Sequence, residues 1–115
     1  MAELTTIARP YAKAVFAHAN AIKAQSFWSV FLKKAAFVTG DFAMVEVLKN
    51  PAVTADTKSE ILADLTQDVA VEGTDALIEI LAHYGRLLVL PAISTEFETL
   101  LAQGQQALEV TITSA

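Results

Sequence analysis

Two histidines are the side chains of this sequence best suited to acid–base or metal chemistry near neutral pH. His18 and His83 each lie in a segment with an unusually large share of apolar residues, so the fold can bring them near one another. A metal site would need carboxylate or further imidazole ligands converging on the same point, and no such set is evident. We therefore expect no metal site and interpret both histidines as boundary residues, half packed and half solvated.

The carboxylates are dispersed along the chain, and one regular set stands out. Glu60, Asp64 and Asp68 follow an i, i+4, i+8 spacing, which on a helix forms an acidic stripe and is typical of a solvated face. A catalytic carboxylate pair needs a cleft that pushes the two pKa values apart, and nothing in the sequence indicates one. We therefore expect no catalytic residue among the acidic side chains.

The residue types that are absent or isolated exclude several further chemistries. There is no cysteine, so the chain has no thiolate nucleophile, disulfide or cysteine metal site. The four glycines are isolated from one another, and neither a phosphate loop nor a dinucleotide fingerprint can be built from them. We expect no cofactor.

The bulk composition describes one globular domain of 115 residues, with 54% apolar and 18% charged residues. The net charge of −5, without a clustered basic face, argues against nucleic-acid binding. The longest apolar runs, such as 87–90, are far shorter than the ~20 residues of a membrane span, and the N-terminus does not resemble a secretory signal. We expect a protein that stays on the cytoplasmic side and does not insert into the membrane.

Hydrophobic periodicity predicts six helices, over residues 5–23, 25–38, about 42–48, about 56–65, 74–84 and 91–107. Pro10 falls near the start of the first helix, where a missing N–H costs least. Asp41 is suited to cap the third helix, and Thr54 or Asp56 the fourth. Gly85 is a good stop for the fifth helix, with Arg86 placed to satisfy its terminal carbonyls. In the second helix, Trp28 is expected to lie in the core, because Phe27, Phe31 and Leu32 surround it at helical spacing.

The last residues differ in character from the rest. Residues 109–113 alternate polar and β-branched apolar side chains, which predicts a strand. A lone strand has nothing to pair with, so we predict a helical domain over residues 1–108 and the start of a second, strand-containing domain over 109–115. The alternative is a disordered tail. The predicted fold class is all-α, a six-helix bundle with a C-terminal strand-like tail.

The first and fifth helices carry more apolar surface than one buried side requires. Each has an apolar arc of roughly 200°, compared with about 100° for an ordinary surface helix. In the first, Ile7, Ala14 and His18 fall on one side of Tyr11, and the other flank holds Ala8, Ala12, Val15, Phe16, Ala19 and Ile22. Two such helices are what a groove for a partner helix requires. The pattern fits equally well with two central helices of the bundle.

Four segments of the chain resemble one known family. They are Ala8-Arg9-Pro10-Tyr11-Ala12-Lys13-Ala14-Val15-Phe16; Leu48-Lys49-Asn50-Pro51-Ala52-Val53 with Lys58 and Ile61-Leu62; Gly85-Arg86-Leu87 with Leu90-Pro91 and Phe97; and Glu109-Val110-Thr111-Ile112-Thr113-Ser114-Ala115. In this order and spacing they resemble the δ subunit of the rotary (F-type) ATP synthase, called oligomycin-sensitivity-conferring protein in mitochondria.

The resemblance implies the N-terminal domain of a non-catalytic stator subunit. In that family the domain is a six-helix bundle that sits on the catalytic head and binds the N-terminal helical segment of the α subunit. A C-terminal domain, which would follow this chain, meets the b subunit of the peripheral stalk. The complex would lie at the cytoplasmic face of the bacterial inner membrane, and the isolated domain is expected to be a monomer.

The resemblance also implies a binding groove between the first and fifth helices. Carried onto this sequence, the groove residues are Ile7, Tyr11, Ala14, Val15, His18, Leu77, Ile80, Leu81 and Tyr84. Ala14 would let a partner helix approach closely, and the two tyrosines offer apolar area with a polar tip. His18 interrupts an otherwise apolar groove, and its protonation is expected to weaken binding.

Two other functions are weighed against the stator adaptor. The first is a self-associating helical scaffold, in which the surplus apolar arc forms the seam of a homodimer. The second is a small hydrolase-like enzyme using His18 or His83, which is disfavoured because no oriented nucleophile–base pair is evident.

Overall fold

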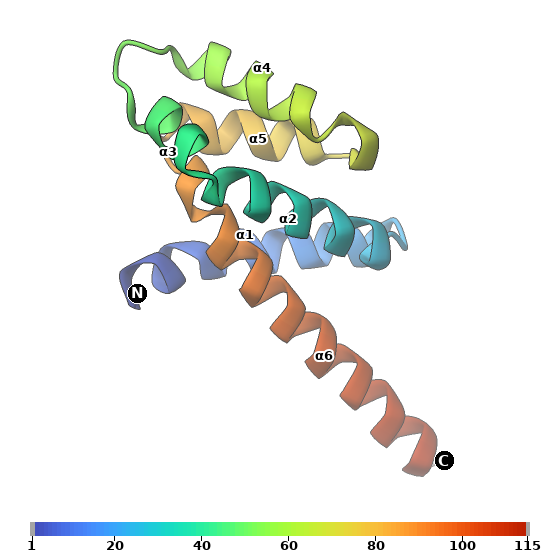
Figure 1. Cartoon of the computed structure of the whole chain (residues 1–115). Helices are drawn as coiled ribbons and strands as arrows, with labels where there is room; N and C mark the ends of the chain where they lie inside the picture. Colours follow the sequence, from blue (N-terminus) through green and yellow to red (C-terminus); the bar gives the residue numbers. More distant parts are fainter. Residues whose placement is uncertain (1, 115) are drawn as a thin grey trace.

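The computed structural model describes the backbone of residues 2–114 and the side chains of residues 3–104, and within that range the chain is all-α with no strand. Its α-helices are α1 (Ala2–Ala21), α2 (Gln25–Gly40), α3 (Phe42–Lys49), α4 (Ala55–Leu65), α5 (Thr74–His83) and α6 (Leu90–Ser114), with short 3-10 helices η1 (Gln67–Val69) and η2 (Leu87–Val89). The predicted all-α class and six helices are confirmed (Figure 1).

Most of the predicted helix ends have a local physical cause in the structure. The Asp41 carboxylate accepts a hydrogen bond from the Met44 amide at 3.3 Å, and the Thr54 hydroxyl accepts one from the Thr57 amide at 3.1 Å. Both side chains thus cap their helices as the sequence predicted. Gly85 ends α5 with a left-handed φ of 66°, a conformation that glycine adopts at little cost.

The start of α1 differs from the prediction. The helix begins at Ala2, three residues earlier than expected. Pro10 consequently lies in the interior of the helix and not in its first turn. It is tolerated there on an exposed side, although it removes one backbone donor from the helical ladder.

The predicted strand over residues 109–113 is wrong, because α6 continues through these residues to Ser114. The β-branched alternation favours an extended chain locally. A strand, however, needs a neighbour to satisfy its N–H and C=O groups, whereas a helix satisfies them within the segment. The proposed division into two domains at residue 108 stays a prediction.

Three helices form the main packing unit. α6 packs along both α1 and α2, and its C-terminal half extends beyond the other helices (Figure 1). On α1, Ala8, Ala12 and Ala19 are fully buried, and such small side chains permit a close approach between helices. Phe97 of α6 is also fully buried and meets the Phe16 ring edge to face, with 5.8 Å between ring centroids.

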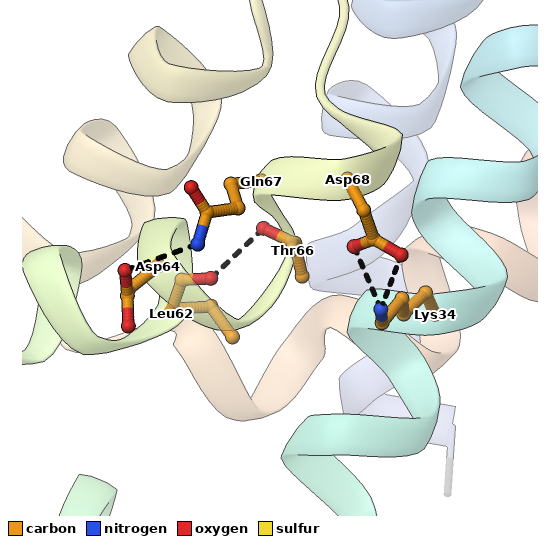
Figure 2. A network of polar contacts seen from close by, with 6 residues as sticks. All are labelled: Lys34, Leu62, Asp64, Thr66, Gln67 and Asp68. Atoms are coloured by element: carbon orange, nitrogen blue, oxygen red, sulfur yellow. Dashed lines mark hydrogen bonds and ion pairs between the residues drawn. The ribbon is translucent and has the colours of Figure 1, made fainter.

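The α4–α5 pair forms a second unit beside α2 (Figure 1). The two helices run antiparallel and are joined through η1. The ammonium of Lys34 on α2 donates to both carboxylate oxygens of Asp68, at 2.7 and 2.8 Å (Figure 2). Next to it, the buried Thr66 hydroxyl donates to the Leu62 carbonyl at 2.8 Å and helps to end α4. These contacts fix the η1 connection against α2.

Candidate partner-binding surface

Helices α1 and α5 are linked by polar contacts at both ends of α5. Just before α5, Nε2 of His18 lies 2.8 Å from the carbonyl oxygen of Glu72. Just after α5, the Arg86 guanidinium donates to the Tyr11 phenol oxygen at 2.9 Å. Because the later residue of α1 meets the earlier end of α5, the two helices run antiparallel, as Figure 1 also shows.

The two flanks of α1 serve different purposes. Ala8, Ala12, Val15 and Ala19, all from one predicted flank, have at most 6% of their surface exposed and belong to the core. On the other flank Ala14 is exposed, while Ile7, Tyr11 and His18 are half-buried. The most deeply buried residues of α1 thus lie on one predicted flank, while Ile7 and Tyr11 of the other flank also pack partly against the core; that the outer flank binds a partner stays a prediction.

Helix α5 is divided in the same way. Leu77 and Leu81 are 7% and 0% exposed and lie in the core, whereas Ile80 and Tyr84 are 47% and 63% exposed. The sequence analysis placed Val15, Leu77 and Leu81 in the groove, and the structure places them beneath the surface. We call the other six predicted residues, which retain accessible surface, the α1–α5 face: Ile7, Tyr11, Ala14, His18, Ile80 and Tyr84.

His18 is a structural tie at one end of this face. Since the Glu72 carbonyl can only accept, Nε2 of His18 carries the hydrogen in their 2.8 Å contact. Its ring also meets the edge of the buried Trp28 indole at 5.8 Å between centroids. Gly73 makes room for it, because a Cβ at that position would lie 2.8 Å from Nε2. An Nε2–H donor exists in both charge states of imidazole, so the predicted effect of protonation on partner binding stays untested.

The second histidine lies elsewhere. His83 is exposed at the last residue of α5 and packs edge to face on Tyr84, 5.1 Å between ring centroids. His18 contacts the opposite end of a 10-residue helix, a distance of ~15 Å at 1.5 Å per residue. The expectation that the two imidazoles lie near one another is therefore wrong. Among the described residues, no group of three histidine or carboxylate side chains converges.

Arg86 occupies the other end of the face. Its backbone amide donates to the Leu81 carbonyl at 2.7 Å and the Gly85 amide to Ala82 at 3.1 Å, the two bonds of a Schellman helix stop. The Arg86 side chain was expected to satisfy terminal carbonyls of α5, but its backbone amide bonds the Leu81 carbonyl instead. The guanidinium turns instead to Tyr11.

The acidic stripe is exposed, as predicted, but its members have different surroundings. Glu60 and Asp64 line an open cleft between α4 and α5, together with Asp75 and Glu79. Asp68 turns away to Lys34, and this charge-assisted hydrogen bond lowers the pKa of the Asp68 carboxyl below its ordinary value of 3.8 (Figure 2). The stripe is therefore not a single functional unit.

One apolar surface is missing from the sequence-based prediction. On the outer side of α2 and at the start of α3, four large apolar residues are strongly exposed: Phe27 at 63%, Val30 at 52%, Phe37 at 81% and Phe42 at 79%. We call this set the α2–α3 face. Trp28 is buried as expected, whereas its neighbour Phe27 points out of the core. The apolar residues of α2 spread almost around the whole helix, so the arc measurement used for the first and fifth helices would have found this surface.

These features define the class of the molecule: a helical bundle whose α1–α5 face presents apolar side chains held between two polar ties. The comparisons agree with a particular family. Residues 7–115 match the family model described as ATP synthase delta (OSCP) subunit. The chain therefore belongs to the ATP synthase delta (OSCP) subunit family, as its sequence motifs indicated.

Two relatives illustrate the similarity. The chain is 41% identical over 115 residues to the ATP synthase subunit delta of Methylobacillus flagellatus, covering 100% of this chain and 65% of that protein. It is 43% identical over 103 residues to the ATP synthase subunit delta of Hahella chejuensis, covering 90% of this chain and 58% of that protein. The chain thus spans less than two thirds of the length of these relatives. No helix within the described residues is long and apolar enough to cross a membrane.

Proposed function

We propose that this chain is the N-terminal helical domain of a stator subunit of the proton-translocating ATP synthase, without catalytic activity of its own. Its α1–α5 face binds the N-terminal helical segment of the α subunit on top of the catalytic head. A following C-terminal domain contacts the b subunit of the peripheral stalk, at the cytoplasmic face of the membrane. The connection would hold the head against the torque of the rotor. Membership of the delta (OSCP) family supports this role.

The observation that carries the proposal is the construction of the α1–α5 face. Ile80 and Tyr84 of α5 expose 47% and 63% of their surface, and Ala14 of α1 is also exposed. The supporting residues Val15, Leu77 and Leu81 are packed in the core and fix the two backbones. An amphipathic helix docks on such a surface through apolar anchors at i, i+3, i+4 and i+7 spacing, and a small residue such as Ala14 admits its backbone.

Binding is tested with a synthetic peptide of the α-subunit N-terminal segment from the same organism. Titration into the labelled chain should shift backbone amides of α1 and α5 in NMR spectra, with smaller changes in α3. Saturable binding with shifts confined to other helices, or no saturable binding, contradicts the proposal. Tyr11→Asp should also reduce binding, with circular dichroism showing whether the fold survives the change.

A steric pair of variants separates binding from folding. Ala14 and Ala43 are both exposed helical alanines, on α1 and α3. Ala14→Arg should remove most peptide binding because the long side chain occupies the docking surface. Ala43→Arg introduces the same charge and volume away from it and should bind normally. Equal effects of the two substitutions would count against the α1–α5 face.

One observation favours the second candidate, a self-associating scaffold. The α2–α3 face exposes three phenylalanines and a valine, and large exposed apolar patches on monomeric proteins mark interaction sites or aggregation liabilities. Sedimentation velocity at tens of micromolar discriminates between the candidates. A monomer supports the adaptor, whereas a dimer abolished by Phe37→Ser supports self-association.

A further inference from the structure

Arg86 has surroundings that distinguish it from the other cations of the domain. Its Nη1 donates to the Tyr11 phenol at 2.9 Å, and its guanidinium carbon lies 6.0 Å from the Tyr11 ring centroid and 5.8 Å from the Tyr84 centroid. Arg9, Lys33 and Lys34 pair with carboxylates, whereas Arg86 is the one cation of the described side chains that lies over aromatic rings. Within residues 3–104 no carboxylate lies at ion-pair distance from Arg86, which is itself exposed.

The guanidinium is held in place before any partner arrives. The Schellman stop fixes the backbone, with Gly85 at a φ of 66° and the Arg86 amide bonded to Leu81 at 2.7 Å. Two tyrosine rings and one phenol oxygen then restrict the side chain. A pre-positioned side chain loses less conformational entropy when it binds. A guanidinium has five N–H donors, and the Tyr11 bond uses one.

We propose that Arg86 is a specificity residue of the α1–α5 face that binds a carboxylate, an Asp or Glu side chain on the docked α-subunit helix. This inference rests on the proposed function. The planar guanidinium fork matches a carboxylate in bidentate geometry. Tyr11 and Tyr84 belong to the same face, so an apolar helix that covers them brings its neighbouring side chains to Arg86.

The charge distribution around the face gives this contact a directing role. On the far side of Tyr84, the cleft between α4 and α5 is lined by Asp56 and Glu79, next to Ile80. An acidic side chain of the partner helix is repelled there and attracted at Arg86. Because the acidic pair and Arg86 all neighbour Tyr84 at the same end of α5, they select one register of a docked helix from several that bury similar apolar area, and the position of Arg86 sets which end carries the carboxylate. We therefore expect the carboxylate to lie at the end of the bound helix nearest the α5 stop.

A double-mutant cycle tests this inference with the α-subunit peptide described above. Each acidic residue of the peptide is changed singly to its amide, Asp→Asn or Glu→Gln, and binding is measured by calorimetry to the 115-residue chain and to Arg86→Gln. One of these peptides should bind the unmodified chain about five-fold more weakly. The same change should make no difference to Arg86→Gln, and added salt should weaken only the pair that retains both charges.

Controls separate recognition from structural damage. Lys13→Gln removes one positive charge from the exposed polar strip of α1 and should keep the full response to the amide peptides. Arg86→Lys retains the positive charge without the planar fork and should keep part of the response to the amide peptides. If Arg86→Gln merely loosened the link to Tyr11, all peptides would weaken equally, and that result overturns the inference.

Two further outcomes distinguish failure of the carboxylate site from failure of the proposed function. Normal peptide binding with no amide substitution coupled to Arg86, or a segment that binds and contains no carboxylate, overturns the carboxylate site and leaves the proposed function standing. A parent peptide that does not bind at all overturns both, since the first depends on the second.

Discussion

The α1–α5 face and the α2–α3 face both expose large apolar side chains, but only the first contains residues, His18 and Tyr11, that are themselves hydrogen-bonded to the segments flanking another helix. The α1–α5 face is bounded by the His18–Glu72 and Arg86–Tyr11 hydrogen bonds. The α2–α3 face exposes larger residues, with Phe37 at 81%, and the polar links beside it come from other residues of α2: Lys34 pairs with Asp68, and Ser29 and Lys33 contact Glu98 of α6. Exposed apolar area alone therefore does not identify a binding site. Fixed geometry around that area is the more informative feature, because it lowers the entropic cost of docking.

The largest expected effect is a loss of stability on substitution of Gly73, which packs against His18 at one end of the α1–α5 face. Gly73 has a φ of 97°, and a Cβ there would lie 2.8 Å from His18 Nε2 and 3.3 Å from Trp28 Cζ2. Gly73→Ala should lower the free energy of unfolding by roughly 2–4 kcal/mol, from backbone strain and overpacking together. Denaturant unfolding followed by the fluorescence of the single tryptophan, Trp28, measures it.

A glycine near the other face provides the matched control. Gly40 ends α2, and a Cβ added there has no neighbour within 4 Å. Gly40→Ala should therefore stabilise the chain by about 0.5 kcal/mol through reduced freedom of the unfolded state. A Gly73→Ala variant as stable as Gly40→Ala would show that the His18 contact does not constrain the start of α5.

The next largest effect is on binding of the α-subunit peptide, tested with one substitution in each face. Ile80 and Phe37 are both exposed, at 47% and 81%. Ile80→Asp should weaken binding of the α-subunit peptide about 30-fold or more, the loss expected for an anchor residue that contributes ~2 kcal/mol to the binding free energy. Phe37→Asp, with the same added charge, should leave the affinity unchanged. The reverse ranking in calorimetric titrations would move the binding site to the α2–α3 face.

The α1–α5 face could be predicted in outline because helical periodicity determines which residues share a flank. Ala8, Ala12 and Ala19 were separated correctly from Ala14 by angle alone. Periodicity does not show how deep a neighbouring helix lies, so it cannot separate groove residues from core residues within one flank; Val15, Leu77 and Leu81, predicted to line the groove, are buried.

Other differences arose from tertiary context. The β-branched pattern of 109–113 favours a strand only if a second strand is present, and without one α6 continues. Phe27 lies at helical spacing from the core residue Phe31, and the helices that pack against α2, chiefly α6, decide which of its sides is covered. The contact between Arg86 and Tyr11 joins residues 75 positions apart, for which the sequence carries no local signal.

A smaller change in stability is expected at the C-terminal ends of α1 and α5, the two helices of the α1–α5 face. Both α1 and α5 end in a Schellman stop, with Ala24 bonded to Ala19 at 2.8 Å and Arg86 to Leu81 at 2.7 Å. The left-handed position is Gly85 in α5 but Lys23, with a φ of 55°, in α1. Lys23→Gly should stabilise the chain by about 0.5–1 kcal/mol, and Gly85→Ala should destabilise it by about 1 kcal/mol. Changes of the same sign in thermal unfolding would contradict this reading of the two helix ends.

The smallest effect belongs to the polar link beside the α2–α3 face, the exposed pair of Lys34 and Asp68. The pair lowers the pKa of Asp68 below 3.8 in the folded chain. At a pH between the folded and the unfolded pKa, the unfolded chain therefore binds more protons than the folded chain. The stabilisation is present above the ordinary pKa and is lost as the pH falls through the lower, folded value. Lys34→Met should therefore reduce the melting temperature slightly near pH 6 and have no effect at a pH well below 3. Because exposed ion pairs are screened, high salt should shrink the difference near pH 6. A difference that persists in acid and in high salt would mean that Lys34 acts through packing between α2 and η1, and the α2–α3 face would then be more firmly built than its exposed polar contacts indicate.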